Sequence, residues 1–489
     1  MASIENPSPQ EQQRAYEEEL RRVSAERRLA RANASRPNYY HRELERLYGF
    51  LVPPNASVLE VGCGGGSLLA SLKPSRGVGV DIDAGAVELA RRRHPSLRFE
   101  AIESYERLDA FAERLGHEST FDFVLLPDVL VDLWDVQAVF RAIRRFCHRD
   151  TRVVINSYSR MWQLPLAAAR KLRLARPRLG RSWLDPNDIR NLLELEGFEC
   201  FRRMNEILCP FPVPIVEQAM NRFLVKLWPF RWFSLTNLFV ARPMPEPMPK
   251  PLTVSVVVPA RNEAGNIRRI IEEIPEMGAG TEIIFVEGNS TDDTWQTLVR
   301  TIPEFPSRRI KLLKQPGKGK GDAVRCGYAA ATGDVLMILD ADLTVPAQDL
   351  RRFHDAIASG RGEFVNGVRL VYPMQDEAMR FLNLVANKFF ALSFSWVLGQ
   401  PIKDTLCGTK VLTRRNYDRL AANRSYFGEF DPFGDFDLIF GAAKLNLRIV
   451  DLPIRYQNRV YGTTNISRWR HGVLLLRMLL LATRRLKFV

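Results

Sequence analysis

Short, nearly unbroken apolar runs alternate with amphipathic stretches over most of the chain. Val335 to Leu339 is the clearest run, and Val254 to Val258 and Glu282 to Val286 precede it. Runs of this length are typical of strands buried on both faces of a parallel sheet, and the stretches between them have the period of amphipathic helices. The pattern therefore predicts an α/β fold, in which ligands bind where parallel strands end.

A second series of such runs lies in the first half of the chain. The strand predicted at 58–61 runs directly into a glycine-rich turn, 62–66, and a helix follows. Glycines let a backbone approach a ligand closely, and the first turn of a helix offers unpaired N–H groups. The next strand, 77–80, ends at Asp81, at the spacing where a carboxylate accepts hydrogen bonds from ribose hydroxyls. This pattern predicts a site for a nucleotide-like cofactor.

Two carboxylates, Asp340 and Asp342, follow the strand 335–339 with one alanine between them. Negative oxygens so close together repel unless a cation lies beside them, and a divalent ion that also binds a diphosphate would neutralise both. An acid-rich turn without a ligand is the alternative. The lysine- and glycine-rich loop 317–322 precedes this strand, and its positive charge at the same sheet edge favours a phosphate ligand.

The length of the chain and one proline-rich stretch indicate two domains. A chain of 489 residues is too long for one ordinary core. Prolines at every second position from Pro243 to Pro251 favour an extended linker. We therefore divide the chain into a polar N-terminal arm (1–36), a first domain (37–241), a linker (242–252), a second domain (253–467) and an amphipathic basic C-terminal helix (468–489).

Charge and cysteine usage indicate the kind of partner and the cellular compartment of the protein. The net charge of +14 favours acidic partners, which include nucleotides, phosphorylated substrates, anionic membranes and nucleic acid. The six cysteines are scattered and form no CxxC pair, which predicts free thiols in a reducing compartment. The amino terminus has no apolar core and is not expected to be a signal peptide, and no run approaches the roughly 18 apolar residues that span a bilayer. We expect a cytoplasmic protein.

The stretch 56–160 resembles the class I S-adenosylmethionine-dependent methyltransferases. EVGCGGG is similar to their first motif, GVGVDID to the second and FDFVLLPDVLVDLWD to the fourth. The resemblance implies a Rossmann-like sheet and a cofactor site formed by Glu60, Gly62 and Gly64, by Asp81 at the ribose and by Glu103 near the adenine. A Rossmann relative with another cofactor, or a domain that binds nothing, is the alternative. No motif identifies a methyl acceptor.

Residues 254–346 resemble glycosyltransferase family 2 of the GT-A fold, and within it the dolichol-phosphate mannose synthase-like enzymes. VSVVVPARNE, FVEGNSTDDT, GKGKGDAVRCGYAAATGD and LDADL occur in family order. By this resemblance Lys320 lies by a diphosphate, and Asp340 and Asp342 hold Mg²⁺ or Mn²⁺ and the nucleotide-sugar donor. The nucleoside would be held by Pro259, Ala260, Asn262, Glu263 and Glu287. Glu287-Gly288 replaces the family's usual aspartate pair, and Thr344 stands where mannose synthases often have glutamine.

Two later segments resemble the acceptor side of the same family. The segment 403–410, which contains Asp404, looks like its acceptor loop, and the segment with Arg459 and Thr464 resembles its basic loop that closes on phosphates. A phosphate acceptor is largely a dianion near neutral pH and needs no strong general base. A hydroxyl acceptor needs a carboxylate within reach, for which Asp437, then Asp435, are the candidates; capping and fold support are the alternative for both.

Two apolar helices are predicted near the C-terminus. The stretch 376–398 is aromatic-rich and either lies at a membrane interface or packs in the core. Residues 469–489 place three arginines seven apart among leucines, and this helix either lies in a lipid headgroup layer or packs against the second domain.

We therefore predict a bifunctional enzyme, peripheral on the cytoplasmic membrane face. The second domain would transfer a sugar from a nucleotide sugar to a polyprenyl-phosphate-type acceptor with inversion, using Asp342, Asp404, Asp437 and Arg459. The first would transfer a methyl group from S-adenosylmethionine. The main alternative is a soluble tailoring enzyme that glycosylates and methylates a small-molecule or polysaccharide hydroxyl. A catalytically inactive scaffold is another. A nucleic-acid partner is not expected, because no aromatic-basic stacking motif occurs.

Overall fold

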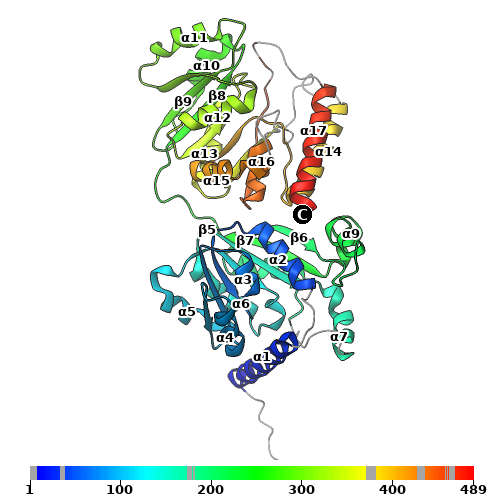
Figure 1. Cartoon of the computed structure of the whole chain (residues 1–489). Coiled ribbons are helices and arrows are strands. Elements are labelled where there is room, and N and C mark those ends of the chain that lie inside the picture. Colours follow the sequence, from blue (N-terminus) through cyan, green and yellow to red (C-terminus); the bar gives the residue numbers. More distant parts are fainter. Residues whose placement is uncertain are drawn as a thin grey trace, which may run out of the picture. The chain divides into compact units, whose positions relative to one another are not determined.

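The computed structural model describes residues 8–32, 39–172, 179, 182–369, 381–426, 436–457, 459, 461 and 468–489. The chain divides into two compact units (Figure 1). Unit 1 comprises Met1–Met244 with Phe488–Val489, and unit 2 comprises Pro245–Lys487. Each unit contains one seven-stranded sheet. The two α/β domains predicted from the apolar runs are confirmed.

The sheet of unit 1 is mostly parallel. Its strand order is β3-β2-β1-β4-β5-β7-β6, in which β1 to β5 run parallel and β7 runs antiparallel to both β5 and β6. The carboxyl ends of β1, β2, β4 and β5 therefore meet at one edge. The strands are β1 (Ser57–Val61), β2 (Arg76–Asp81), β3 (Arg98–Ala101), β4 (Phe121–Pro127), β5 (Cys147–Tyr158), β6 (Phe198–Glu206) and β7 (Thr236–Pro243).

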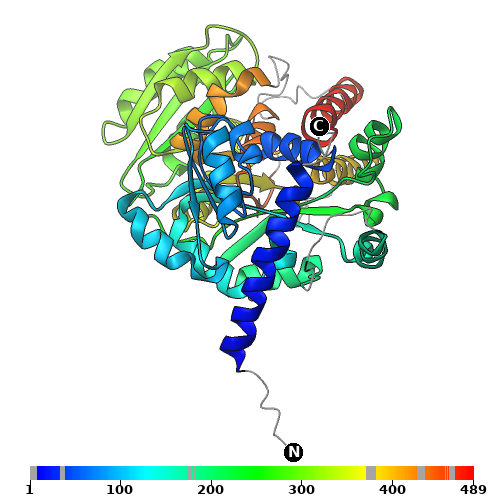
Figure 2. The same ribbon diagram turned by 60° about the horizontal axis from the view of Figure 1, so that its bottom comes forward.

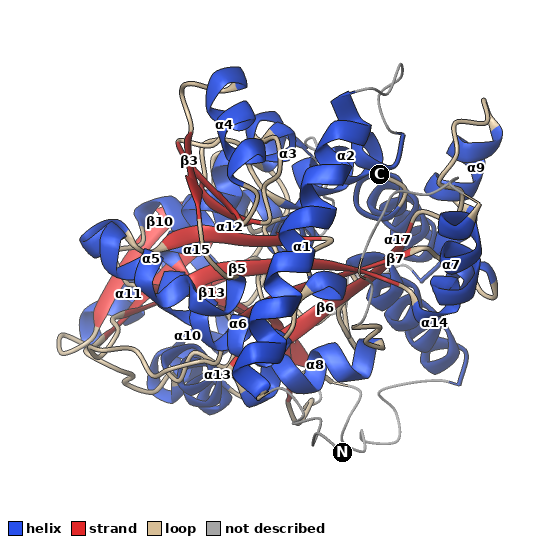
Figure 3. Cartoon of the chain, turned by 90° about the horizontal axis from the view of Figure 1, so that it is seen from below, coloured by secondary structure: helices blue, strands red, loops and turns tan. Residues whose placement is uncertain are grey.

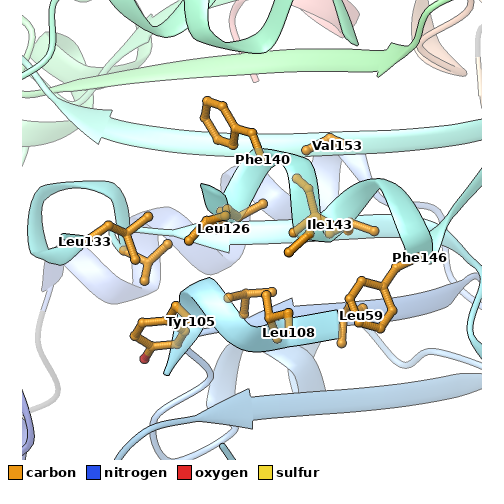
Figure 4. Close-up of a cluster of buried hydrophobic side chains, with 14 of the residues drawn as sticks. Leu59, Tyr105, Leu108, Leu126, Leu133, Phe140, Ile143, Phe146 and Val153 are labelled. Atoms are coloured by element: carbon orange, nitrogen blue, oxygen red, sulfur yellow. The ribbon is translucent and has the colours of Figure 1, made fainter. Parts of the chain in front are cut away.

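Both faces of this sheet are covered, as its apolar runs predict. Leu59, Leu126 and Val153 point into one core, which also contains Phe140 and Ile143 (Figure 4). Their neighbours along the strands belong to a second core on the opposite face. The helices of the unit are α1 (Pro9–Ala32), α2 (Tyr39–Leu51), α3 (Ser67–Ser71), α4 (Ala84–Arg93), α5 (Leu108–Leu115), α6 (Val136–Ile143), α7 (Gln163–Lys171), α8 (Pro186–Leu195) and α9 (Val216–Arg222).

Helix α8 begins with a capping box. The carboxylate of Asp185 accepts hydrogen bonds from the backbone N–H groups of Asn187 and Asp188, at 2.6 and 3.0 Å. Asp188 completes the capping box, because its side chain accepts from the N–H of Asp185 at 2.8 Å. Pro186 stands at the first helical position, where its missing N–H removes no helical hydrogen bond.

The segment that the sequence treats as a polar arm contains the long helix α1, the dark blue helix of Figure 2. Its side chains Tyr16, Leu20 and Val23 are buried. They recur every three or four residues and so lie on one face of the helix. The ring of Tyr16 packs at a tilt against that of Trp134, with centroids 5.3 Å apart, and Tyr16 joins the core of unit 1. Helix α1 is therefore packed on the domain through an apolar face.

The sheet of unit 2 has the order β10-β9-β8-β11-β13-β12-β14. Strands β10, β9, β8 and β11 are parallel neighbours, β13 is antiparallel to β11 and β12, and β14 pairs parallel with β12. The parallel half contains the three apolar runs from which the fold was predicted. The strands are β8 (Val254–Ala260), β9 (Thr281–Glu287), β10 (Arg309–Lys314), β11 (Val335–Ile338), β12 (Phe364–Val368), β13 (Lys410–Thr413) and β14 (Ile449–Pro453).

Helices lie around this second sheet (Figure 1). Helices α14 and α17 lie side by side. Phe394 and Val397, near the end of α14, are buried, as the core interpretation of this helix expects, whereas Phe389 and Leu392 are exposed. The membrane-interface interpretation stays a prediction. The helices are α10 (Ile267–Glu273), α11 (Thr294–Thr301), α12 (Lys320–Ala330), α13 (Leu350–Ala358), α14 (Phe381–Leu398), α15 (Arg414–Ala422), α16 (Phe436–Lys444) and α17 (Arg468–Ala482). Within the described residues, no helix has the length and apolar character needed to cross a bilayer.

Candidate functional site

Unit 2 gathers the sequence-predicted acids and amides at one edge of its sheet. Asp340 and Asp342 follow β11, Asn262 and Glu263 follow β8, and Glu287 is the last residue of β9. Because these three strands are parallel neighbours, their carboxyl ends lie next to one another. The arrangement forms the candidate ligand site of unit 2.

Asp340 is surrounded by positive charge. Its Oδ1 lies 2.7 Å from Nζ of Lys320, the first residue of α12. Gly408 packs against this pair, and a Cβ added at Gly408 would overlap both the carboxylate and the ammonium group. Desolvation opposes the charge, but Lys320 and two further basic side chains outweigh it and hold the pKa of Asp340 below its ordinary value. Asp340 is therefore a carboxylate at neutral pH with a lysine fixed against it.

Asp342 shares a basic partner with Glu263. Nη2 of Arg459 lies 2.6 Å from Oδ2 of Asp342, and Nη1 lies 3.4 Å from Oε1 of Glu263. The other oxygen of Asp342 accepts hydrogen bonds from the backbone N–H and the hydroxyl of Thr344, at 3.1 and 2.8 Å. Desolvation raises the pKa of the Glu263 carboxyl, and Arg459 offsets this only in part. Arg459 thus links the end of β8 to the end of β11.

The predicted nucleoside-binding residues lie around the loop 288–293. Pro259 and Ala260 end β8, and Asn262 follows with a φ of 57°. Oδ1 of Asn262 accepts a hydrogen bond of 2.8 Å from a backbone N–H of this loop, and Oε1 of Glu287 accepts another of 2.5 Å. These side chains therefore fix the shape of the loop that would contact a nucleoside.

Asp404 is buried, and its carboxylate is engaged on both oxygens. Nε and Nη2 of Arg369 contact Oδ2 and Oδ1 at 2.7 and 2.9 Å, and two backbone N–H groups of the loop 403–410 donate to Oδ1 at 3.0 and 3.2 Å. Desolvation opposes the charge, but Arg369 outweighs it and lowers the pKa of Asp404. Because a carboxylate with so many donors is a weak base, this geometry supports a positioning role for Asp404, which fixes the loop that carries Gly408.

Asp437 does not join this group. It is the second residue of α16, and its Oδ2 lies 3.3 Å from Nε of Arg424. Both residues line a small cavity between α15 and α16, and none of the predicted donor-binding residues is among the described residues that line it. Thr464 and Asp435, the other acceptor-side candidates, lie outside the described residues.

Asp340 and Asp342 are the candidate metal ligands of unit 2. Within the described part of the chain, no group of three or more His, Cys, Asp or Glu side chains could hold a metal ion. Carboxylate oxygens are nonetheless the donors that Mg²⁺ prefers, and protein-bound Mg²⁺ usually takes its remaining ligands from water and substrate phosphates. The two acids therefore fit a metal that is shared with a diphosphate.

Unit 1 has a cavity of about 220 Å³ at the carboxyl edge of its sheet. Glu60, Gly62, Gly64 and Asp81 all line it. The two glycines have φ values of 82° and 51°, which glycine adopts without strain. Oε2 of Glu60 accepts a hydrogen bond of 3.1 Å from the N–H of Leu69, and Oδ2 of Asp81 accepts one of 2.8 Å from the N–H of Gly64. These carboxylates therefore hold the glycine turn and the helix after it.

Helix α1 forms part of the cavity wall. Arg27 and Arg28 line the cavity, and Nη2 of Arg27 lies 2.9 Å from Oδ2 of Asp132. Nε of Arg28 lies 3.3 Å from Oδ2 of Asp83, which caps α4. Glu103, predicted near the adenine, is exposed and is not among the described residues of the wall. Basic residues of α1 therefore form part of the wall of this cavity.

A buried polar network surrounds Asp128, which also lines this cavity. Asp128 follows β4 with a φ of 54°, and its carboxylate accepts hydrogen bonds from the hydroxyls of Tyr40 and Tyr158, at 2.7 and 3.1 Å. The amide of Asn156 donates to it at 2.5 Å. Burial, reinforced by the charge of Asp128, raises the pKa of Tyr40 well above its ordinary value. The network therefore presents a carboxylate supported by neutral donors.

Three features of these sites were not indicated by the sequence analysis. They are the arginines of α1, the Arg369 partner of Asp404, and the network around Asp128. The contact of α1 had a weak signal, namely apolar residues at helical spacing in a charged segment. The other two join residues far apart along the chain, so no local pattern marks them. The buried apolar residues of α1 are at positions 16, 20 and 23.

Each unit of the chain matches one family model. Residues 255–420 match the model described as Glycosyl transferase family 2, and residues 31–202 match one described as Methyltransferase domain. The first match falls in unit 2 and the second in unit 1.

Several curated proteins are similar to part of the chain. Glycosyltransferase AglJ of Haloferax volcanii is 28% identical over 46% of this chain and 70% of its own length. The dolichol-phosphate mannosyltransferase of Pyrococcus furiosus is 32% identical over 44% of this chain and 60% of its own length. The undecaprenyl-phosphate 4-deoxy-4-formamido-L-arabinose transferase of Salmonella paratyphi B is 31% identical over 44% of this chain and 62% of its own length. The chain thus spans 60 to 70% of these three relatives.

Among solved structures, the chain is similar to glucosyl-3-phosphoglycerate synthase from Mycobacterium tuberculosis. The sequence identity is 21%, the alignment covers 48% of this chain and 80% of that one, and the TM-score is 0.36.

Gly408→Ala should disrupt the Lys320–Asp340 pair, because the added methyl group occupies the space of both charged groups. We expect unit 2 to lose about 1–3 kcal/mol of stability in denaturant unfolding. Any ligand of Asp340 should bind at least about tenfold more weakly in calorimetry. The matched control is Gly472→Ala, where the new methyl group meets open space. Unchanged stability and ligand affinity in Gly408→Ala would show that the close approach of Gly408 to Lys320 and Asp340 is not needed for folding or binding.

Proposed function

Because this chain joins a methyltransferase domain to a glycosyltransferase family 2 domain of the GT-A fold, we propose that it performs both transfers. Unit 2 transfers a sugar from a nucleotide sugar to a polyprenyl-phosphate-type acceptor, with inversion and with a divalent metal. Unit 1 transfers a methyl group from S-adenosylmethionine. The observation that carries the first proposal is the pair Asp340 and Asp342 at the end of β11, next to Lys320, Arg459 and Glu263.

The charges at this edge suit a leaving diphosphate. A nucleoside diphosphate gains negative charge as the bond to the sugar breaks, and positive groups fixed beforehand stabilise that charge without reorganising. Lys320 and Arg459 are such groups, and each is held by a carboxylate. A divalent ion on Asp340 and Asp342 would supply Lewis-acid stabilisation to the departing phosphate oxygens. Binding of the donor would then exchange the carboxylate partners of the two basic residues for phosphate oxygens.

The acceptor assignment rests on chemistry and on the relatives. Two of them are named for transfer to dolichol phosphate and undecaprenyl phosphate. A phosphate oxygen attacks as an anion and needs no strong base. Accordingly, Asp340, Asp342 and Glu263 are paired with basic groups. Asp437 pairs with Arg424 outside this group. The alternative, a soluble tailoring enzyme acting on a hydroxyl, requires a carboxylate that takes a proton.

The outer surface of unit 2 supports a lipid-borne acceptor. Helices α14 and α17 expose large apolar side chains along their paired length. Apolar surface next to basic side chains suits the headgroup layer of an anionic membrane. The exposed side chains are Val385, Phe389, Leu392, Val473, Leu476 and Leu480. We propose that unit 2 is peripheral on a cytoplasmic membrane face.

The cavity of unit 1 supports methyl transfer. Gly62 and Gly64 allow a close approach of the backbone to a ligand. Asp81 lines the same cavity, where its carboxylate would accept hydrogen bonds from a ribose. S-adenosylmethionine, when bound there, supplies an electrophilic methyl group. Asp128 lines the same cavity and lies within its network of hydroxyl and amide donors, so it is placed to bind a polar group of the acceptor.

Asp342→Asn should abolish the metal-dependent part of donor binding, because it removes one of the two proposed metal ligands. In a thermal-shift panel of nucleotide sugars with Mg²⁺ or Mn²⁺, one donor should stabilise the wild type by about 3 kcal/mol at a hundredfold excess over Kd. The variant should lose most of this. Asp355→Asn, at an exposed carboxylate of α13, is the control. Equal donor binding by the wild type under exhaustive chelation would overturn the metal assignment.

Asp437→Asn separates the phosphate acceptor from a hydroxyl acceptor. For a phosphate acceptor we expect turnover within about threefold of the wild type, because no general base is needed. Arg424→Gln is the matched control, because it breaks the same ion pair from the other side. It should lower the unfolding temperature about as much as Asp437→Asn does. A loss of turnover of about 100-fold or more in Asp437→Asn, with intact donor binding, would instead support Asp437 as a base and the tailoring alternative.

Asp81→Asn should weaken S-adenosylmethionine binding at least about tenfold, because a carboxylate accepts stronger hydrogen bonds than an amide and also holds Gly64. Calorimetric titration of the full chain measures the change. Asp109→Asn, at an exposed carboxylate of α5, is the control. If the wild type gives no heat or thermal shift with S-adenosylmethionine, the cofactor assignment of unit 1 fails while that of unit 2 is untouched.

A further inference from the structure

Unit 1 exposes large apolar side chains in two neighbouring segments. Among the described residues, 13 of the 25 exposed large apolar side chains lie in segments 161–172 and 211–233. We call these exposed side chains the apolar surface. Single exposed apolar residues are ordinary, but a contiguous set of this size marks an interaction site. Leu164 is 80% exposed, Ile215 82% and Trp228 69%.

The loop before α9 holds apolar side chains away from the domain. In residues 209–215, CPFPVPI, prolines alternate with apolar residues, and Phe211, Val213 and Ile215 are all exposed. Each proline fixes its own φ and biases the residue before it to extended backbone. Ile215 has a φ of 69°, which a β-branched residue adopts only under constraint. The loop is thus stiff, and its apolar residues gain no burial in the described structure.

The remaining part of the apolar surface is aromatic. The 3₁₀ turns Leu224–Lys226 and Phe230–Phe233 follow α9, and Trp228, Trp232 and Phe233 in this region are exposed. The turn before β7 is tied to the start of α7, because Nε1 of Trp162 donates to the carbonyl of Phe233 at 2.9 Å. Helices α7 and α9 lie on the same side of unit 1 (Figures 1 and 3). The two segments therefore form one surface.

This surface lies at the sheet edge that carries the cavity. Segment 161–172 follows the carboxyl end of β5, and segment 211–233 connects the end of β6 to the start of β7. Tyr158 pairs with Thr236 across β5 and β7, so both segments leave the sheet at the same edge. Asp128 and the glycine turn follow β4 and β1 at that edge. The hydroxyl of Tyr158, the last residue of β5, contacts Asp128 at 3.1 Å.

The charge around the apolar surface is basic. Arg160, Lys171 and Arg231 are exposed within or beside it, whereas Glu217 is the only acidic residue of the two segments. Tryptophan favours the level of lipid headgroups, where its amphipathic ring meets both water and acyl chains. Phenylalanine adds apolar area that can enter the boundary between headgroups and acyl chains. Basic side chains next to such rings are attracted to anionic lipids.

We propose that the apolar surface of unit 1 docks onto an anionic phospholipid bilayer. The proline-stiffened loop and the tryptophans of 228–232 enter the headgroup region, and the basic residues contact lipid phosphates. The cavity of the methyltransferase unit then opens at the level of the membrane, where a lipid-borne methyl acceptor would be found. This inference concerns unit 1 alone and does not depend on the donor or acceptor of sugar transfer.

Vesicle flotation of the full chain tests the proposal. The wild type should float with phosphatidylcholine vesicles that contain phosphatidylglycerol, and less with phosphatidylcholine alone. Phe211→Ser with Ile215→Ser, and separately Trp228→Ser with Trp232→Ser, should each reduce binding at least about tenfold. Because these side chains are exposed, the variants should keep the thermal shift that the wild type gives with S-adenosylmethionine.

Two further variants locate the contact. Leu29→Ser with Leu195→Ser removes exposed apolar side chains of unit 1 that lie outside the apolar surface and should leave flotation unchanged. Leu476→Ser with Leu480→Ser removes those of α17 in unit 2. If only the α17 variant loses vesicle binding, or if the wild type does not float, the proposal is wrong. It is equally wrong if the apolar-surface variants convert a dimer to a monomer in analytical ultracentrifugation while vesicle binding persists, because the surface then contacts a second copy of the chain.

Discussion

Both sites depend on how carboxylates at the ends of parallel strands are stabilised. Parallel strands bring acids from distant parts of the chain to one edge, where unpaired carboxylates would repel one another. In unit 2, Lys320 and Arg459 resolve this repulsion for Asp340 and Asp342. In unit 1, Asp81 is held instead by the backbone N–H groups of Gly64 and Asp83. The first arrangement suits a polyanionic ligand that competes for the basic groups, and the second suits a ligand that shares the carboxylate.

Glycine determines how closely these charges approach. No side chain fits at Gly408 beside the Lys320–Asp340 pair, and the glycine turn after β1 reaches its positive φ values without strain. Asp404 contributes indirectly, because its contacts with Arg369 and with backbone N–H groups fix the loop that contains Gly408. The shape of the loop 403–410 is thus defined by packing and hydrogen bonds.

The strand ends were predictable because the information is local. An apolar run followed by an acid or a glycine turn marks a buried strand and what it delivers, and Asp81, Asp340 and Asp342 all lie where that rule puts them. No such local rule applies to Asp437, which lies in a helix. Its surroundings depend on how α15 and α16 pack, and that packing pairs it with Arg424. Local sequence did not reveal the packing of α1 either, because a charged helix with few apolar residues has the composition of a solvated arm.

By itself the sequence determined that the chain has two α/β domains, where their strands end, and which kinds of side chain stand at those ends, since periodicity and spacing are properties of neighbouring residues. Tertiary structure alone decided that α1 forms a wall of the cavity in unit 1, that Arg459 links Asp342 to Glu263, and that segments 161–172 and 211–233 form one apolar surface. Each of these joins residues far apart along the chain. Such contacts arise only when sheet order and loop packing bring the residues together.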